Sequence, residues 1–292
     1  MPPPVWNSVV PWWGRRFRLP RLRLPTERVS PACYNSDVTR TLAFLFLAGS
    51  LCRAAELKPE AIQAYDRYVH DTEARLAATK PFLWADASAT RLQQVKQGQT
   101  VVAPWKDEGD TFVPGASIHD WVGAIFIPGV TLAKTLAVLQ DYDHHKTIYK
   151  DVPESKLLEH NGNDFKYYRL RELHNGPISG VFRTDLEAHY QQIDATRWTC
   201  ATRTTKVVEI ENYGKPKQKE IPQGHGSGYL WKLAGYWRLE QRDNGVYLEC
   251  ETLSLTRGLP PIIGALFTSS THALEREGLT ATLQATRDAA KK

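Results

Sequence analysis

Several groups of polar residues in the sequence have the chemistry of metal ligands. Asp141, Asp143, His144 and His145 form the densest group, and carboxylates and imidazoles are common ligands of divalent metals. Adjacent histidines rarely face one ion, however, and no second set of ligands follows at an ordered spacing. We therefore interpret this group as a solvated helix end and predict no metal site.

Signatures of nucleotide binding and of nucleophilic catalysis are weak. His225 lies in the glycine loop 224–228, whose glycines do not follow a strand and open a helix as a phosphate loop would. His119 lies at the start of a predicted strand. No Gly-x-Ser-x-Gly elbow occurs, and Ser227 and Ser254 have no evident base. The sequence predicts no catalytic residue and no cofactor.

The strongest structural signal is a hairpin formed by segments 228–241 and 245–256, joined by Asn244-Gly245. The first strand alternates between an apolar face, formed by Tyr229, Trp231, Leu233, Trp237 and Leu239, and a polar face, formed by Lys232, Arg238 and Glu240. We expect the apolar face to be covered. We expect the polar face, which Glu249 and Glu251 extend, to be solvated and to carry cross-strand ion pairs.

A long helix is expected after the hairpin, because Pro260 and Pro261 precede apolar residues at helical spacing up to Leu283. Further helices are predicted at 59–78, on the outside of the main domain, and at 130–140, with Thr131 as N-cap. A short turn should cover 145–150. Segment 80–114 is interpreted as a connector with one short strand at 100–103. Other strands are predicted at 118–127, 155–160, 164–173, 181–193 and 198–211.

Cys200 and Cys250 lie in predicted strands that the 228–241 strand would separate in a sequential meander. Two inter-strand spacings amount to ~10 Å, which is too far for a disulfide. We expect two buried free thiols that pack as small apolar residues.

Residues 1–54 are interpreted as a leader. An apolar run at 41–51 has the length of a signal-peptide core, and Cys52 and Ala54 fit a small-x-small cleavage site. Met1 is the only methionine and precedes a Pro-, Trp- and Arg-rich stretch. We therefore expect translation to begin at Val38, so that a signal peptide from Val38 to Ala54 exports a bacterial protein to the periplasm or the medium. The alternative is a basic arm that binds nucleic acid or acidic lipid.

The positive charge of the chain belongs mostly to this leader. The chain has 37 Lys/Arg and 32 Asp/Glu; without the leader's eight basic and two acidic residues, the net charge changes from +5 to about −1. The composition therefore gives no support for nucleic-acid binding, and we expect no nucleic-acid partner.

The order of elements and several segments resemble the START/SRPBCC superfamily, which includes polyketide cyclases and coenzyme-Q-binding START proteins. The similar segments are Phe126–Gly129, Leu139–Asp143, Val152–Leu158, Gly228–Arg238, Gly245–Glu251 and Ser254–Arg257. The resemblance implies an α+β helix-grip fold over residues 115–290. In this fold a curved seven-stranded antiparallel sheet wraps around a long C-terminal helix, here with an N-terminal helical extension at 55–114.

The resemblance also implies an apolar tunnel, between the sheet and the C-terminal helix, that holds a hydrophobic small molecule such as a lipid or a quinone. Pockets for such ligands are lined by aromatic and aliphatic side chains. The residues predicted to line it are Trp198, Trp231, Leu233, Trp237, Leu248, Cys250 and Thr252 from the sheet and Ile263, Leu266 and Phe267 from the helix. We expect a monomer that makes transient contact with membranes.

Two other functions stay open at the level of the sequence. A polyketide cyclase-like or other enzyme would use the same tunnel and would need a polar group in it, such as Tyr190, Tyr236 or Arg169. A protein-interaction module would instead present an exposed apolar patch on the outer face of the sheet.

Overall fold

The computed structural model describes residues 56–106, 109–176, 178–258 and 261–292, with side chains left out for 261–267. The predicted leader lies outside the described residues. The elements are α2 (Pro59–Ala78), η1 (Trp84–Ala87), α3 (Ala89–Lys96), β1 (Val101–Pro104), β2 (Asp110–Val113), β3 (Ala116–Pro128), α4 (Leu132–Gln140), α5 (His145–Ile148), β4 (Ser155–Asn161), β5 (Asp164–Asn175), β6 (Ile178–Gln192), β7 (Arg197–Glu211), β8 (Lys219–Glu220), β9 (Lys232–Arg242), β10 (Gly245–Arg257) and α6 (Pro261–Ala290).

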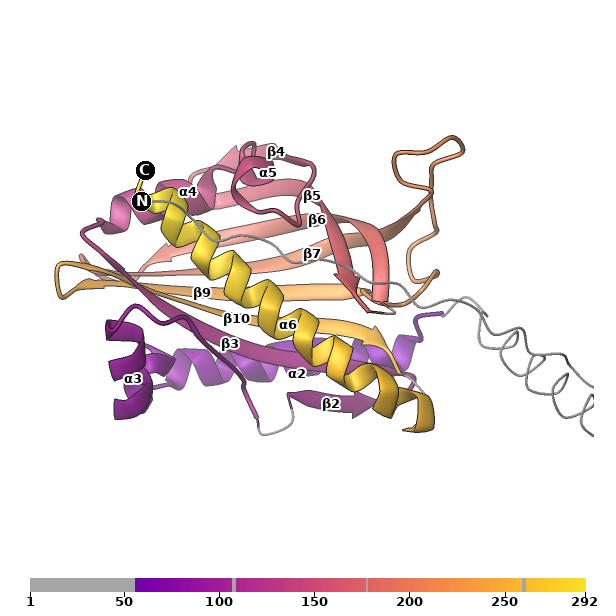
Figure 1. The fold of residues 1–292 in the computed structure, drawn as a ribbon, viewed down its shortest axis with the longest axis horizontal. Coiled ribbons are helices and arrows are strands. Elements are labelled where there is room, and N and C mark those ends of the chain that lie inside the picture. The colour runs from indigo at the N-terminus through magenta and orange to yellow at the C-terminus, as the bar shows by residue number, and fades with distance from the viewer. Residues whose placement is uncertain (1–55, 107–108, 177, 259–260) are drawn as a thin grey trace, which may run out of the picture. The chain divides into compact units, whose positions relative to one another are not determined.

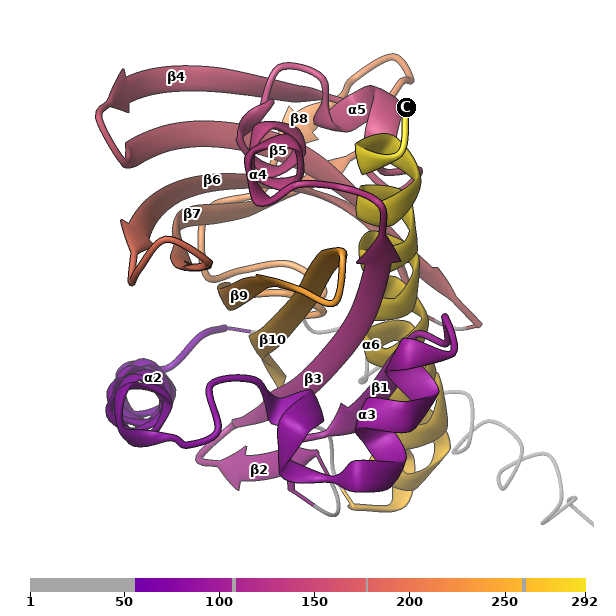
Figure 2. The ribbon, with the colours of Figure 1, turned by 90° about the vertical axis from the view of Figure 1, so that its left-hand side faces the viewer.

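The strands form one antiparallel sheet in the order β1-β3-β10-β9-β7-β6-β5-β4, with β2 paired to β3 and β8 paired to β7. The sheet curves around α6, which runs along its concave face (Figures 1 and 2). The predicted helix-grip fold is therefore confirmed. The described sheet has ten strands instead of seven because short β1, β2 and β8 extend it.

The hairpin of β9 and β10 has the turn that its sequence predicts. Asp243 and Asn244 both have positive φ, 53° and 54°, and Arg242 pairs with Gly245. Positive φ at both central residues is the type I′ geometry of two-residue hairpin loops, and here the central residues are Asp243 and Asn244. A Cβ at Gly245, the first residue of β10, would lie 2.5 Å from the Ile127 carbonyl oxygen of β3. The neighbouring strand therefore requires glycine at this position.

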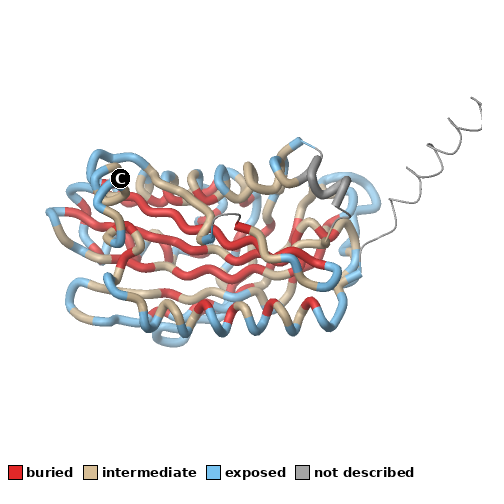
Figure 3. The backbone as a smooth tube through the Cα atoms, turned by 90° about the horizontal axis from the view of Figure 1, so that it is seen from below, coloured by how far each residue is buried: buried red, intermediate tan, exposed pale blue. Residues whose placement is uncertain are grey.

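The main core lies between the concave face of the sheet and the C-terminal half of α6. Leu279 and Leu283 of α6 pack in one cluster with Ile125, Leu239 and Leu248 from three strands. Figure 3 shows that the buried residues are concentrated along the strands. A Cβ on Gly123 of β3 would lie 2.8 Å from Leu283 Cδ1, so this glycine allows α6 to approach the sheet closely.

The α4 helix begins as predicted. The Thr131 side chain accepts a hydrogen bond from Lys134 N at 3.3 Å, which satisfies one of the free amides of the first turn. The Gln241 side chain of β9 accepts another from Leu132 N at 2.7 Å. These bonds fix the start of α4 beside the β9–β10 hairpin.

The outer face of the sheet is covered, so the prediction of a solvated polar face is wrong. Arg238, Glu249 and Glu251 are only 6%, 4% and 3% exposed, because they contact α2, η1 and the segment between them. Figure 2 shows α2 on the side of the sheet opposite to α6. The predicted α2 and its position outside the main domain are confirmed. The connector 80–114 was underestimated, since it contains η1, α3 and β2 in addition to the short strand β1.

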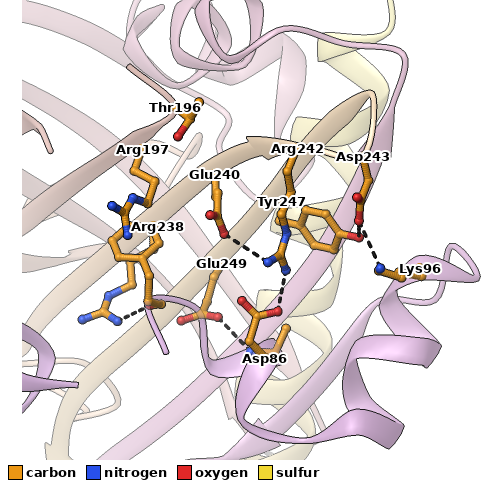
Figure 4. A network of polar contacts seen from close by, with 12 residues as sticks. Asp86, Lys96, Thr196, Arg197, Arg238, Glu240, Arg242, Asp243, Tyr247 and Glu249 are labelled. Atoms are coloured by element: carbon orange, nitrogen blue, oxygen red, sulfur yellow. Dashed lines mark hydrogen bonds and ion pairs between the residues drawn. The ribbon is translucent and has the colours of Figure 1, made fainter. Parts of the chain in front are cut away.

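The covered polar groups are paired with the helical extension. Arg238 donates to the carbonyl oxygens of Leu76 and Phe82. Glu249 accepts a bond from Ala85 N at 3.3 Å, and the neighbouring contacts around Arg242 and Asp86 belong to the same layer (Figure 4). The polar face of the hairpin thus serves as the attachment surface for α2 and η1.

Both predicted thiols are free and buried. Trp237 of β9 is the register partner of Cys200 on one side and of Cys250 on the other. The predicted separation of the two cysteines by the β9 strand is therefore confirmed. Within the described residues, no helix is long and apolar enough to span a membrane.

Candidate functional site

A cavity of about 160 Å³ lies between the concave face of the sheet and α6. Its described lining comes from β2, β3, β5, β6, β7, β9, β10 and α6, and from the segments between α5 and β4 and before β9. An engineered apolar cavity of about 150 Å³ in another protein binds benzene. The cavity therefore has room for a ligand of about one ring.

Four of the predicted lining residues face this cavity, namely Leu233, Trp237, Cys250 and Thr252. They are adjacent in the antiparallel register of β9 and β10, where Trp237 pairs with Cys250. Because side chains alternate across a strand, all four point to the concave face. Their contact with a ligand stays a prediction.

Leu248 and Trp198 lie on the same face of the sheet, but outside the cavity lining. Leu248 is fully buried in the main core, and Trp198 packs against that core from the edge. At the end of the sheet where these two residues lie, α4 and the C-terminal half of α6 cover the concave face. These side chains therefore serve as packing in the described structure.

The prediction that Trp231 lines the cavity is wrong. Trp231 is 4% exposed and packs with Tyr65 and Ala61 of α2 and with Leu255 on the outer face. It precedes the first residue of β9, Lys232, so the alternation within that strand does not determine its direction. Trp231 fits the apolar pattern because it is buried under α2, and not because it lines the cavity.

Ile263, Leu266 and Phe267 belong to the first turns of α6, but their side chains lie outside the described residues. Their predicted ligand contact is therefore not addressed by the structure. The described part of α6 contributes Thr268, Thr271, Leu274, Glu275, Gly278, Leu279 and Thr282 to the lining.

One end of the cavity contains a histidine held between an acid and a hydroxyl. His119 Nδ1 lies 2.6 Å from Asp110 Oδ1, and His119 Nε2 lies 2.9 Å from Thr256 Oγ1. His272 of α6 contacts the other carboxylate oxygen of Asp110 at 3.0 Å. Burial raises the pKa of Asp110, but the hydrogen bonds and charges of His119 and His272 outweigh it and hold that pKa below its ordinary value.

This group was not predicted from the sequence. His119 was assigned only to the start of a strand, and Asp110 lay in the segment that was interpreted as a connector. Asp110 and His119 are nine residues apart and pair in the β2–β3 hairpin, so a prediction of β2 would have brought them together. His272 lies 162 residues from Asp110 in the chain, and no local spacing connects it to the other two.

The other polar region of the cavity contains two arginines and one carboxylate. Arg171 donates to Asp151 Oδ2 at 2.9 Å, and Arg169 lies two residues before it on the same face of β5. Burial raises the pKa of Asp151, but the charges of Arg171 and Arg169 outweigh it, so the pKa is lowered. Tyr149 lies beside them and donates to, or accepts from, Thr286 Oγ1 at 3.0 Å.

Of the polar groups named for the enzyme alternative, only Arg169 lines the cavity. Tyr190 is hydrogen-bonded to Tyr142 within the core at 3.0 Å. Tyr236 points to the outer face, where its hydroxyl donates to Glu73 of α2 at 3.0 Å. Neither tyrosine can therefore reach a molecule in the cavity from the described position.

The acid and histidine group after α4 is mostly solvated, as predicted. Asp141 contacts His144 at 2.7 Å on the surface, and Asp143 accepts a hydrogen bond from Leu157 N. His145 is the exception, because it is 4% exposed, and burial together with the charge of Arg169 lowers its pKa to about 3. Among the described residues, no group of three or more His, Cys, Asp or Glu could hold a metal ion.

No protein-family model matches the chain, and no curated protein matches its sequence. Solved structures similar to it include a STAR-related lipid transfer protein from Xanthomonas axonopodis, with 16% identity and a TM-score of 0.42 over 66% of this chain and 99% of the other. The ZhuI aromatase/cyclase of a Streptomyces species has 12% identity and a TM-score of 0.42 over 60% and 94%. Human STARD10 has 10% identity and a TM-score of 0.41 over 70% and 80%.

The identities and TM-scores are low, so the assignment of fold rests on the strand order and on the position of α6. On that basis the chain has the helix-grip fold, with a covered outer face and a cavity under its C-terminal helix.

Proposed function

We propose that this protein binds or carries a hydrophobic small molecule in the cavity between the sheet and α6. The observation that carries the proposal is the cavity itself, whose lining includes Leu233, Trp237, Cys250, Leu274 and Leu279. Clefts with a mostly apolar lining and a few polar groups are the usual binding sites of small ligands.

A ligand as large as a lipid needs more room than the cavity offers. A groove of about 1070 Å³ lies outside α6, between that helix, α5 and the end of β5. The cavity and the groove share Tyr149, Asp151, Arg171, Leu173, Leu274 and Gly278 in their linings. A long ligand would extend along this shared wall after a small displacement of side chains.

Native mass spectrometry with organic extraction tests the proposal on protein expressed from Val38 into a periplasm. We expect a hydrophobic molecule to co-purify in stoichiometric amount. Trp237→Phe should reduce its occupancy, whereas Trp231→Phe is the matched control that changes the same residue type on the outer face. An empty protein, or equal occupancy in both variants, would contradict the proposed site.

A second candidate function is catalysis in the same cavity, as in polyketide cyclase-like enzymes. The specific observation in its favour is His119, which lines the cavity and is oriented by Asp110. Turnover of aromatic polyketide-like substrates that disappears in His119→Gln would support it. If the wild-type protein shows no turnover, or if turnover is unchanged in the variant, the catalytic function is contradicted. Binding or transport of a ligand then remains as the proposed function.

A further inference from the structure

The Arg169 guanidinium lines the cavity and has no ion pair with another described residue. Its Nε atom is buried and makes no hydrogen bond among the described residues, and no ion pair of Arg169 occurs among them. Its neighbours across the sheet are small, since Ser155 of β4 and Thr184 of β6 are its register partners. The long side chain therefore extends over them into the cavity.

Several other described polar side chains of the lining are hydrogen-bonded inside the protein. The Nε atoms of Arg171 and Arg257 are also buried without a hydrogen bond, but Arg171 is paired with Asp151 and the Arg257 guanidinium lies over the Tyr229 ring. Thr202 donates to the Gly235 carbonyl at 3.2 Å, and Ser254 donates to Glu275 at 2.5 Å. His119 is held on both sides, as described above. A buried polar group without a partner costs free energy, and a charged one costs more. Among the described arginines of the lining, Arg169 is thus the one whose guanidinium has neither an ion pair nor a ring contact, and a ligand would supply that contact.

The side chains around Arg169 together carry a net positive charge. Arg169 and Arg171 share one nearby carboxylate, Asp151, which is already hydrogen-bonded to Arg171. His145 is buried and neutral, because its pKa is lowered to about 3 by burial and by Arg169. The cluster therefore carries one net positive charge at pH 7.

We propose that the molecule bound in this cavity is an amphipathic monoanion whose carboxylate pairs with Arg169 while its apolar body occupies the space beside Trp237 and Leu233. The inference rests on the proposed function and specifies the class of ligand. A guanidinium presents its N–H groups in a planar fork that matches a carboxylate. One net positive charge is neutralised by one carboxylate, whereas a phosphate dianion would leave an excess negative charge.

Benzoate and acetophenone provide a matched pair of probes, because a carboxylate in one replaces an acetyl group of similar shape in the other. Both have the size of ligand that the cavity admits. Dissociation constants are measured by ligand-observed NMR titration for the wild-type protein, Arg169→Gln and Arg169→Lys. Arg183→Gln is the matched control, because Arg183 lies on the neighbouring strand β6 and is paired with Asp185 on the other face.

We expect the wild-type protein to bind benzoate at least about tenfold more tightly than acetophenone, as charge-assisted hydrogen bonds of this kind allow. Arg169→Gln should lose about tenfold for benzoate and less than about twofold for acetophenone. Arg169→Lys should be intermediate, and Arg183→Gln should match the wild type. Unchanged binding of acetophenone shows that the variant cavity is intact.

Equal affinity of the wild-type protein for the two probes, or an equal loss of both in Arg169→Gln, overturns the inference and leaves the proposed function standing. Failure of both probes to bind the wild-type protein, together with an empty protein in native mass spectrometry, overturns the proposed function as well. The neutral probe therefore separates the two failures.

Discussion

Glu249 is a fully buried acid on the outer face of the sheet, and burial raises its pKa to about 8 although the positive charge of Arg238 acts against that shift. In the unfolded chain the same acid titrates near its ordinary value of about 4.3. The folded state therefore keeps a proton that the unfolded state has lost between these pH values. The resulting contribution to stability is complete below about pH 4 and is lost as the pH rises toward 8.

Glu249→Gln is expected to remove part of this pH dependence, because an amide oxygen can still accept the bond from Ala85 N without titrating. Thermal unfolding followed from pH 5 to pH 8 should show a smaller decrease of Tm in this variant than in the wild-type protein. Glu187→Gln, at an exposed position of β6, is the control and should keep the wild-type slope. A wild-type slope in Glu249→Gln would mean that another group titrates.

At the scale of elements, α2 is attached to the sheet through buried polar contacts in addition to its apolar cluster with the outer face. Arg75 forms an ion pair with Glu251, whose side chain is 4% exposed, and stacks on Trp105 at 3.7 Å. Tyr65 and Tyr68 of the same helix donate to the Leu253 carbonyl and to Asp120. Removal of one partner leaves a buried charge unpaired.

Arg75→Ala should therefore destabilise the protein by about 3 kcal/mol. Urea unfolding gives this value directly, and Arg67→Ala on the exposed face of α2 is the control, with an expected change within about 0.5 kcal/mol. A loss of less than 1 kcal/mol for Arg75→Ala would indicate that solvent compensates the Glu251 charge.

Elements with a strong local signal could be predicted from the sequence. The α2 helix has Pro59 in its first turn and a regular apolar stripe, and the β9–β10 hairpin has Asn244-Gly245. The α3 and β2 elements were missed because their segments are short and polar. The polar face of the hairpin was misinterpreted because alternation shows which side chains share a face, but not which element from elsewhere in the chain covers that face.

At the scale of the whole molecule, the position of the cavity followed from the predicted order of elements, but its polar content did not. Leu233 and Trp237 were identified by alternation within β9. The contacts of Asp110 with His119 and His272 join the neighbouring strands β2 and β3 to α6, which is distant in sequence. The proposed role of Arg169 depends on which hydrogen bonds and ion pairs the neighbouring side chains already form. A sequence pattern does not contain this information.

Export of the chain stays a prediction that belongs to this scale. Expression from Val38 in a bacterial host with a periplasm should give a secreted product. Its intact mass should correspond to a chain that begins at Ala55. Phe46→Arg interrupts the apolar run and should abolish processing, with the precursor retained in the cytoplasm. A wild-type product that keeps residues 38–54 would contradict the predicted cleavage after Ala54.

Cys200, Trp237 and Cys250 are aligned across three strands, and one of the two cysteines lies at the cavity. The rate at which Cys250 is alkylated can therefore report the fraction of molecules that hold a ligand. Cys250 lines the cavity, and burial raises its pKa well above the ordinary value, whereas Cys200 lies outside the described lining. Alkylation of Cys250 therefore requires a reagent to enter the cavity and meet a thiolate there. We expect its modification rate to fall in proportion to the fraction of filled molecules. Cys200→Ser protein without residues 1–54, and therefore without Cys33 and Cys52, is the single-thiol sample read by mass spectrometry.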